Sequence, residues 1–96
     1  MKTYTGDRTI DGLVVTVDGE PLATHADTHL YSDGGFEWSY EGEAPSQLAY
    51  AMLVDHLGDT AKAEAMQDKF MRAIVANFQN EWVMTSADID RALTAL

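Results

Sequence analysis

The hydrophobic pattern of this chain changes once, near Gly42, and that change sets the order of its secondary structure. Before Gly42 the sequence favours short strands and turns, because runs of β-branched and aromatic residues are separated by glycine-containing turn dipeptides. After it, apolar residues recur every three or four positions, which is typical of amphipathic helices. Strands followed by helices predict an α+β fold, with a small antiparallel sheet of about three to five strands packed on one face by two to three helices.

The length of the chain limits it to one domain. Its 96 residues are enough for one modest core. We therefore expect a single domain over residues 1–96, with strands and hairpins in residues 1–42 and helices in residues 44–96. No stretch reaches the roughly 20 apolar residues that cross a bilayer, and the first residues lack the apolar block of a secretory signal. The expected location is the cytoplasm.

Two hairpins are predicted in the first half. Leu13–Val17 is rich in β-branched residues and runs into Asp18-Gly19, a dipeptide that accepts the positive φ angles of a tight turn. The returning strand would be Glu20–Thr24, and Pro21 predicts that it lies at a sheet edge.

The second hairpin would join His29–Tyr31 to Phe36–Tyr40 across Ser32–Gly35. Aromatic residues alternate with polar ones along its second strand. Because alternate residues of a strand share a face, these aromatics would line one face and seat the helices.

Local signals place the helices. The first would begin near Pro45 and stop at Gly58, and Asp59 or Thr60 would cap the second, which would end within residues 77–80. Residues 82–84 are expected to form a short extended connector. Thr85 to Asp88 then resembles a capping box that opens a short final helix.

Charge is the least ordinary property of the sequence. Six lysines and arginines face sixteen aspartates and glutamates, for a formal net charge of -10, and neither lysine nor arginine occurs between Arg8 and Lys62. Such a field repels nucleic-acid phosphates and anionic membranes, and it attracts basic protein surfaces. Direct binding to nucleic acid or to membrane is therefore not expected. The alternative is that the acidity serves only solubility.

Several segments carry a family resemblance: Lys2–Arg8, Gly35–Tyr40, Pro45–Ala49, Asp55–Asp59 and Thr85–Ile89. Together they resemble a family of short bacterial and phage proteins catalogued only as a domain of unknown function. The resemblance implies a setting in phages and other mobile elements, and it implies no activity, cofactor or catalytic residue. Relatives tend to have glycine where Ser39 stands.

The first functional hypothesis is a non-catalytic protein-binding module that inhibits or modulates a host protein with a basic surface. Turns and the outer sheet face would present its partner-binding carboxylates, which are Asp18, Glu20, Asp33, Glu37, Glu41 and Glu43. By analogy alone, an inhibitor of a nucleic-acid-guided bacterial defence complex, an anti-CRISPR protein, is one concrete version. No cofactor is expected. Trp82 is the aromatic residue predicted to reach a partner, although core packing is its more common role.

The second hypothesis is a small metal-assisted hydrolase. In an extended segment His25, Asp27 and His29 would point the same way, and two histidines with one carboxylate are a zinc-ligand set. Cysteine ligands are excluded because the chain has no cysteine. The same residues serve equally well as a polar loop.

The third hypothesis is a structural or oligomerisation component, such as a homodimer that pairs through the edge strand near Pro21 or through helix surface left uncovered. Asp55 and His56 do not make a convincing serine triad with Ser39 or Ser46, because adjacent helix positions point about 100° apart.

Overall fold

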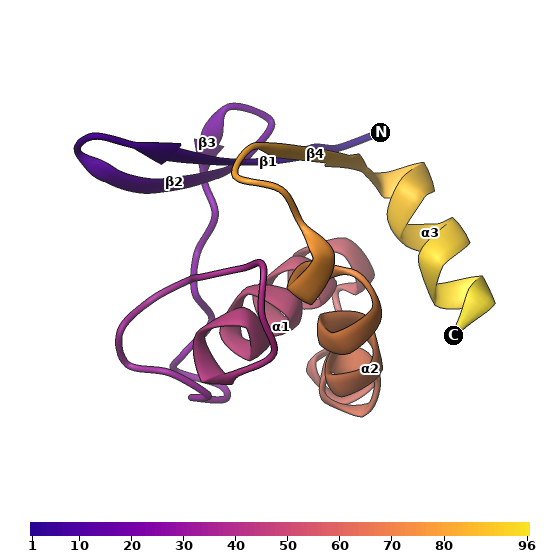
Figure 1. Ribbon diagram of the computed structural model, residues 1–96. Helices are drawn as coiled ribbons and strands as arrows, with labels where there is room; N and C mark the ends of the chain where they lie inside the picture. The colour runs from indigo at the N-terminus through magenta and orange to yellow at the C-terminus, as the bar shows by residue number, and fades with distance from the viewer.

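The computed structural model describes residues 1–96, and it confirms the α+β fold (Figure 1). The elements follow in the order β1 (Thr3–Thr9), β2 (Gly12–Val17), β3 (Glu20–Pro21), α1 (Glu43–Leu57), α2 (Thr60–Ala73), a 3-10 turn (Val75–Asn77), β4 (Trp82–Thr85) and α3 (Ser86–Ala95). Figure 1 shows the sheet across the top, α1 and α2 beneath it, and α3 extending from the end of β4. No helix is long and apolar enough to span a membrane.

The sheet has four antiparallel strands in the order β3-β2-β1-β4. The inner strand β1 was not predicted from the sequence, because most of its residues are polar. The segment expected to be a connector is β4, which pairs with β1 from Thr3↔Thr85 to Gly6↔Trp82. The sheet is therefore completed by a strand from the helical half of the chain.

The first hairpin is confirmed. Asp18 and Gly19 have φ angles of 51° and 84°, the left-handed values that a tight two-residue turn requires. The returning strand is only Glu20–Pro21, shorter than expected, and it lies at the sheet edge as Pro21 predicted.

The prediction of a second hairpin is wrong. Residues 22–42 contain neither strand nor helix. The three aromatic residues do not share a face: Trp38 is completely buried, Phe36 is half-buried and Tyr40 is exposed. A turn does form at Asp33 and Gly34, but the segments on either side do not pair as strands, because hydrogen bonds to residues far away in the sequence hold them.

Gln47, on α1, supplies the largest group of those bonds. Its side chain is completely buried. Its Oε1 accepts from the backbone N–H groups of Tyr31 (2.7 Å) and Ser32 (3.1 Å), and its Nε2 donates to the carbonyls of Thr24 (2.8 Å) and His29 (3.1 Å). One amide thus satisfies four backbone groups that would otherwise need a strand partner.

Helix α1 forms the centre of the core, and every residue from Pro45 to Leu53 is buried. It ends at Gly58, whose φ of 67° gives the left-handed cap that glycine favours. Asp59 caps α2 by accepting from the Lys62 N–H at 3.1 Å. The predicted capping box of Thr85 and Asp88 opens α3, and the backbone hydrogen bond from Thr85 lowers the pKa of Asp88.

Arg8 fastens residues 36–40 to the sheet. Its guanidinium forms an ion pair with Glu37 (2.6 Å), donates to the Trp38 carbonyl (2.9 Å) and to Asn80 Oδ1 (3.1 Å), and lies 4.7 Å from the centroid of the Trp38 ring. Ser39 follows with a φ of 78°, the backbone conformation that glycine adopts most readily. The Arg8 contacts and the Gln47 amide together give the segment its shape.

We expect Arg8→Ala to lower the free energy of unfolding by about 1–2 kcal/mol, because a buried carbonyl loses its donor and the Trp38 ring loses its covering cation. Urea denaturation measures the change. Arg91→Ala is the matched control, because Arg91 pairs only with Asp88 at the surface. This substitution should lower the free energy of unfolding by less than about 0.5 kcal/mol. Equal losses in the two variants would contradict this role for Arg8.

Candidate functional site

The six carboxylates predicted to bind a partner divide into two classes. Glu37 and Glu41 form ion pairs with Arg8 and Arg72, at 2.6 Å and 2.7 Å. No lysine, arginine or histidine lies within ion-pair distance of the other four, Asp18, Glu20, Asp33 and Glu43. The cations of the chain therefore leave most of this set uncompensated.

The uncompensated carboxylates come from different elements. Asp18 lies in the turn between β2 and β3, Glu20 begins β3, Asp33 lies in the loop of residues 22–42, and Glu43 begins α1. All four residues are exposed, but Asp18 also has a structural role, because its Oδ1 accepts the Thr3 N–H at 2.9 Å.

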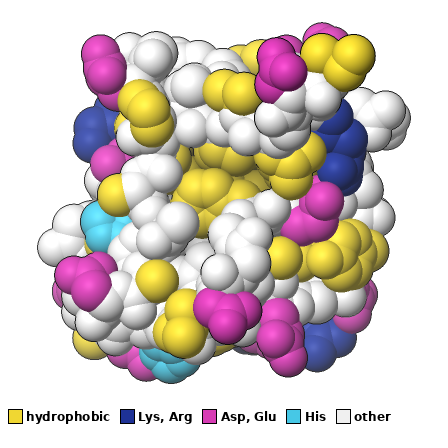
Figure 2. All heavy atoms as spheres, turned by 90° about the vertical axis from the view of Figure 1, so that its left-hand side faces the viewer, with side chains coloured by type: hydrophobic (Ala, Val, Ile, Leu, Met, Phe, Trp, Pro, Cys, Tyr) yellow, Lys and Arg dark blue, Asp and Glu magenta, His cyan; other side chains and the backbone are white.

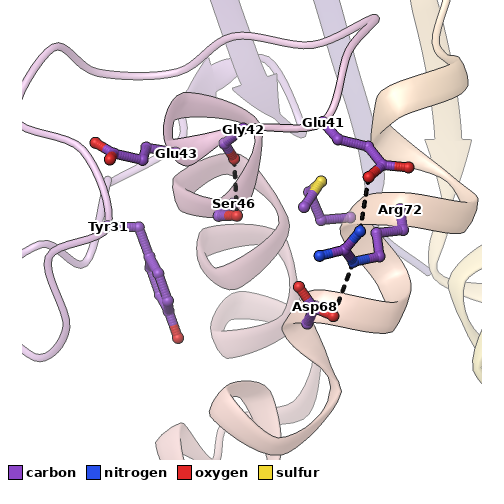
Figure 3. A pocket seen from close by; sticks show the side chains of 8 residues that line it. Tyr31, Glu41, Gly42, Glu43, Ser46, Asp68 and Arg72 are labelled. Carbon is purple, nitrogen blue, oxygen red and sulfur yellow. Dashed lines mark hydrogen bonds and ion pairs between the residues drawn. The ribbon is translucent and has the colours of Figure 1, made fainter.

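Glu41 and Glu43 line a surface pocket of about 380 Å³ at the start of α1 (Figure 3). Six other residues complete its wall: Tyr31, Gly42, Ser46, Asp68, Met71 and Arg72. The pocket brings together three carboxylates and one guanidinium, so its charge is negative. Such a pocket favours a cationic group from a partner over an anionic one.

Arg72 connects α2 to the loop that precedes α1. Its Nη1 contacts Glu41 at 2.7 Å and its Nε contacts Asp68 at 3.0 Å. The hydrogen bond with Asp68 and the nearby charge of Glu41 raise the pKa of Arg72. Figure 3 shows Glu43 pointing away from this guanidinium, which leaves its carboxylate open to a second cation.

The remaining polar wall of the pocket is structural. The Ser46 hydroxyl donates to the Gly42 carbonyl at 2.8 Å, within the first turn of α1. Burial raises the pKa of Tyr31, which stacks on His29 with ring centroids 4.0 Å apart. Neither group is arranged as an activated nucleophile.

The structure does not bring His25, Asp27 and His29 together as metal ligands. The prediction assumed an extended segment, but His25 has a φ of 54° and a turn follows at residues 26–28. His29 instead contacts Glu64 on α2, with Nδ1 2.9 Å from Oε1. Because of this turn, the side chains of residues 25, 27 and 29 do not point the same way, as the predicted metal site required.

Asp55 and His56 each join elements of the fold instead of forming a triad. Asp55 accepts the Tyr4 hydroxyl at 2.6 Å and pairs with Lys2 at 3.1 Å. Burial and the contact with Asp55 raise the pKa of Tyr4. His56 points elsewhere, toward Asp90 on α3, with Nε2 2.6 Å from Oδ1.

Trp82 is buried, with 7% of its surface exposed. It stacks on Phe78 at 4.2 Å between centroids and meets Trp38 edge-on at 5.9 Å. Trp82 therefore has the core-packing role and does not form a surface for contact with a partner.

Sequence reasoning missed the contributions of α2 to the pocket. Asp68 and Arg72 come from a helix that carries charges of both signs, so their sequence context looked neutral. The available signal was the short connection at Gly58 and Asp59, which makes α1 and α2 antiparallel neighbours and sets the end of α2 beside the start of α1.

No curated protein and no solved structure matches the chain significantly. One family model, described as a family of unknown function (DUF6166), matches residues 4–95. The match spans the sheet, the pocket and all three helices. The chain therefore belongs to the family of unknown function DUF6166.

Proposed function

We propose that this protein is a non-catalytic binding module that docks through its uncompensated carboxylates on a basic surface of another protein. The observation that carries the proposal is the ion-pair pattern: Glu20, Asp33 and Glu43 are exposed and have no cationic partner in a chain of net charge -10. Exposed charge of one sign accelerates association with a surface of the opposite sign and selects against like-charged partners.

The partner that fits this chemistry is a host protein whose basic groove binds nucleic acid. Carboxylates would occupy positions that phosphates take in the natural complex, so docking would inhibit nucleic-acid binding. The mobile-element setting implied by the family resemblance supports such an inhibitor of a cytoplasmic defence complex, and this version rests on analogy.

The proposal predicts that neutralising Glu20, Asp33 and Glu43 removes binding while the fold survives. The test variant carries Glu20→Gln, Asp33→Asn and Glu43→Gln, and Asp18 is kept because its carboxylate bonds to Thr3. We expect proteins that wild type captures from a bacterial lysate in 50 mM salt to bind the purified variant at least tenfold more weakly. Isothermal titration with each captured protein measures the difference.

A second triple variant controls for net charge. Asp7→Asn, Asp27→Asn and Glu81→Gln neutralise three other carboxylates that form no ion pair, and the change in net charge is the same. This variant should bind within threefold of wild type. Equal weakening by both triples would show that only the total charge matters, and no binding by wild type would overturn the proposal.

A further inference from the structure

One half of β2 has a strand partner on only one side. On the side away from β1, β3 pairs with Thr16 and Val17 only, and the Leu22 N–H adds one bond to the Val15 carbonyl at 3.1 Å. The chain then leaves the sheet. The residues Gly12–Val14 pair with β1 along their whole length but form a free sheet edge on the other side.

The register shows which backbone groups face this free edge. The two-residue turn at Ile10 and Asp11 makes Thr9↔Gly12 the hydrogen-bonded pair that closes the hairpin. Hydrogen-bonded pairs alternate along an antiparallel ladder, so Val14 bonds to β1 and Leu13 directs its N–H and C=O to the opposite side. The bond from Leu22 to Val15, two residues further along, has this same direction.

A groove of about 400 Å³ runs along the same edge. The groove contacts four consecutive residues of β2, Leu13 to Thr16. Because successive strand residues point to opposite faces of a sheet, a groove that contacts all four lies along the edge of the strand. Its lining residues are Leu13, Val14, Val15, Thr16, Pro21, Leu22, Thr24, Gly35 and Phe36. Leu13 and Val14 are 37% and 47% exposed, so apolar surface is available beside the unpaired backbone.

Three carboxylates without cationic partners lie within two residues, along the chain, of residues that line the groove. Asp11 precedes Leu13 by two residues, Glu20 adjoins Pro21, and Asp33 precedes Gly35 by two residues. None of the three forms an ion pair. Figure 2, which faces the left-hand side of Figure 1, shows hydrophobic side chains in a central hollow, with acidic side chains and some basic ones around it.

We propose that this edge binds an extended segment of a partner protein in which apolar side chains alternate with lysine or arginine. The segment adds a strand beside Leu13, places its apolar side chains in the groove and directs its cations toward Asp11, Glu20 and Asp33. The inference rests on the proposed function and names the form in which the basic partner binds. A second copy of this chain fits poorly, because each copy carries a net charge of -10 and would bring like charges together.

The test uses the heptapeptide Lys-Val-Lys-Val-Lys-Val-Lys and nuclear magnetic resonance of the labelled full chain in 50 mM salt. We expect chemical-shift changes at residues 12–16 and 35–36. Methylation of the central valine amide removes a strand donor and should weaken binding at least fivefold. Val14→Lys should weaken binding at least tenfold, whereas Val83→Lys, at the exposed position of the opposite edge strand, should leave it within twofold.

The outcomes separate this inference from the proposed function. If the peptide binds with changes only near Glu41 and Glu43, or if methylation has no effect, the strand-addition inference fails while acidic docking stands. If the peptide does not bind at all, but proteins captured through the carboxylates do, strand addition again fails alone. A dimer that Val14→Lys dissociates in sedimentation would overturn the inference in favour of a second copy.

Discussion

Gln47→Leu is expected to lower the free energy of unfolding by about 3–5 kcal/mol, because four backbone groups lose their hydrogen-bond partner at once. The side chain is completely buried, and its amide bonds to backbone groups of residues 24–32. Leucine keeps the volume but leaves two donors and two acceptors without partners. Urea denaturation followed by circular dichroism measures the loss.

Gln67 provides a matched control for that substitution. It lies on α2, and its Oε1 is buried without a hydrogen-bond partner. Replacing it with leucine removes an unsatisfied acceptor, so Gln67→Leu should change stability by less than about 0.5 kcal/mol or increase it. Similar losses in the two variants would contradict the view that the Gln47 amide holds the loop.

Gly6→Ala should lower the free energy of unfolding by about 3 kcal/mol, at the upper end of the range for an overpacked core. A Cβ at position 6 would overlap the Trp82 indole. The ring has little room to move, because it stacks on Phe78 and meets Trp38 edge-on. We therefore expect a lower melting temperature in thermal denaturation. We also expect faster amide exchange in β1 and β4, because the added Cβ strains their pairing.

Gly34→Ala is the control for this second substitution. A Cβ there would meet only the Ser32 hydroxyl, at 3.7 Å, so stability should change by less than about 0.5 kcal/mol. Combining Gly6→Ala with Trp82→Leu should cost less than the sum of the two single changes, because the smaller side chain makes room for the Cβ. Additive losses would show that the ring is not the obstacle.

The parts of the fold that the sequence predicted correctly are those set by local chemistry. Gly58, Asp59 and the pair Thr85 and Asp88 cap helices through bonds to neighbours within four residues. The turn at Asp18-Gly19 needs only the φ angles of two adjacent residues. Such features can be predicted from a short window of sequence.

The parts that failed depend on distant residues. The edge strand β4 is short, and it fits beside β1 because Gly6 leaves space for Trp82. The segment 22–42 carried a plausible hairpin signal, but Gln47 and Arg8 hold it in a different shape. No local pattern reveals either relation.

The candidate site divides in the same way. The excess of carboxylates before Lys62 is visible in the sequence. Which of them a cation neutralises is a tertiary property: Arg8 reaches Glu37 and Arg72 reaches Glu41 from distant parts of the chain. The histidine cluster failed because a left-handed residue, His25, replaced the extended backbone that the spacing argument assumed.

The most direct test of acidic docking is the salt dependence of binding to a purified captured partner. Association constants for wild type and for the Glu20, Asp33 and Glu43 triple variant are measured between 50 and 300 mM salt. Docking through these carboxylates predicts that wild-type affinity falls steeply with salt and that the triple variant has a clearly smaller slope. Affinities that do not change with salt, or equal slopes for the two proteins, would contradict it.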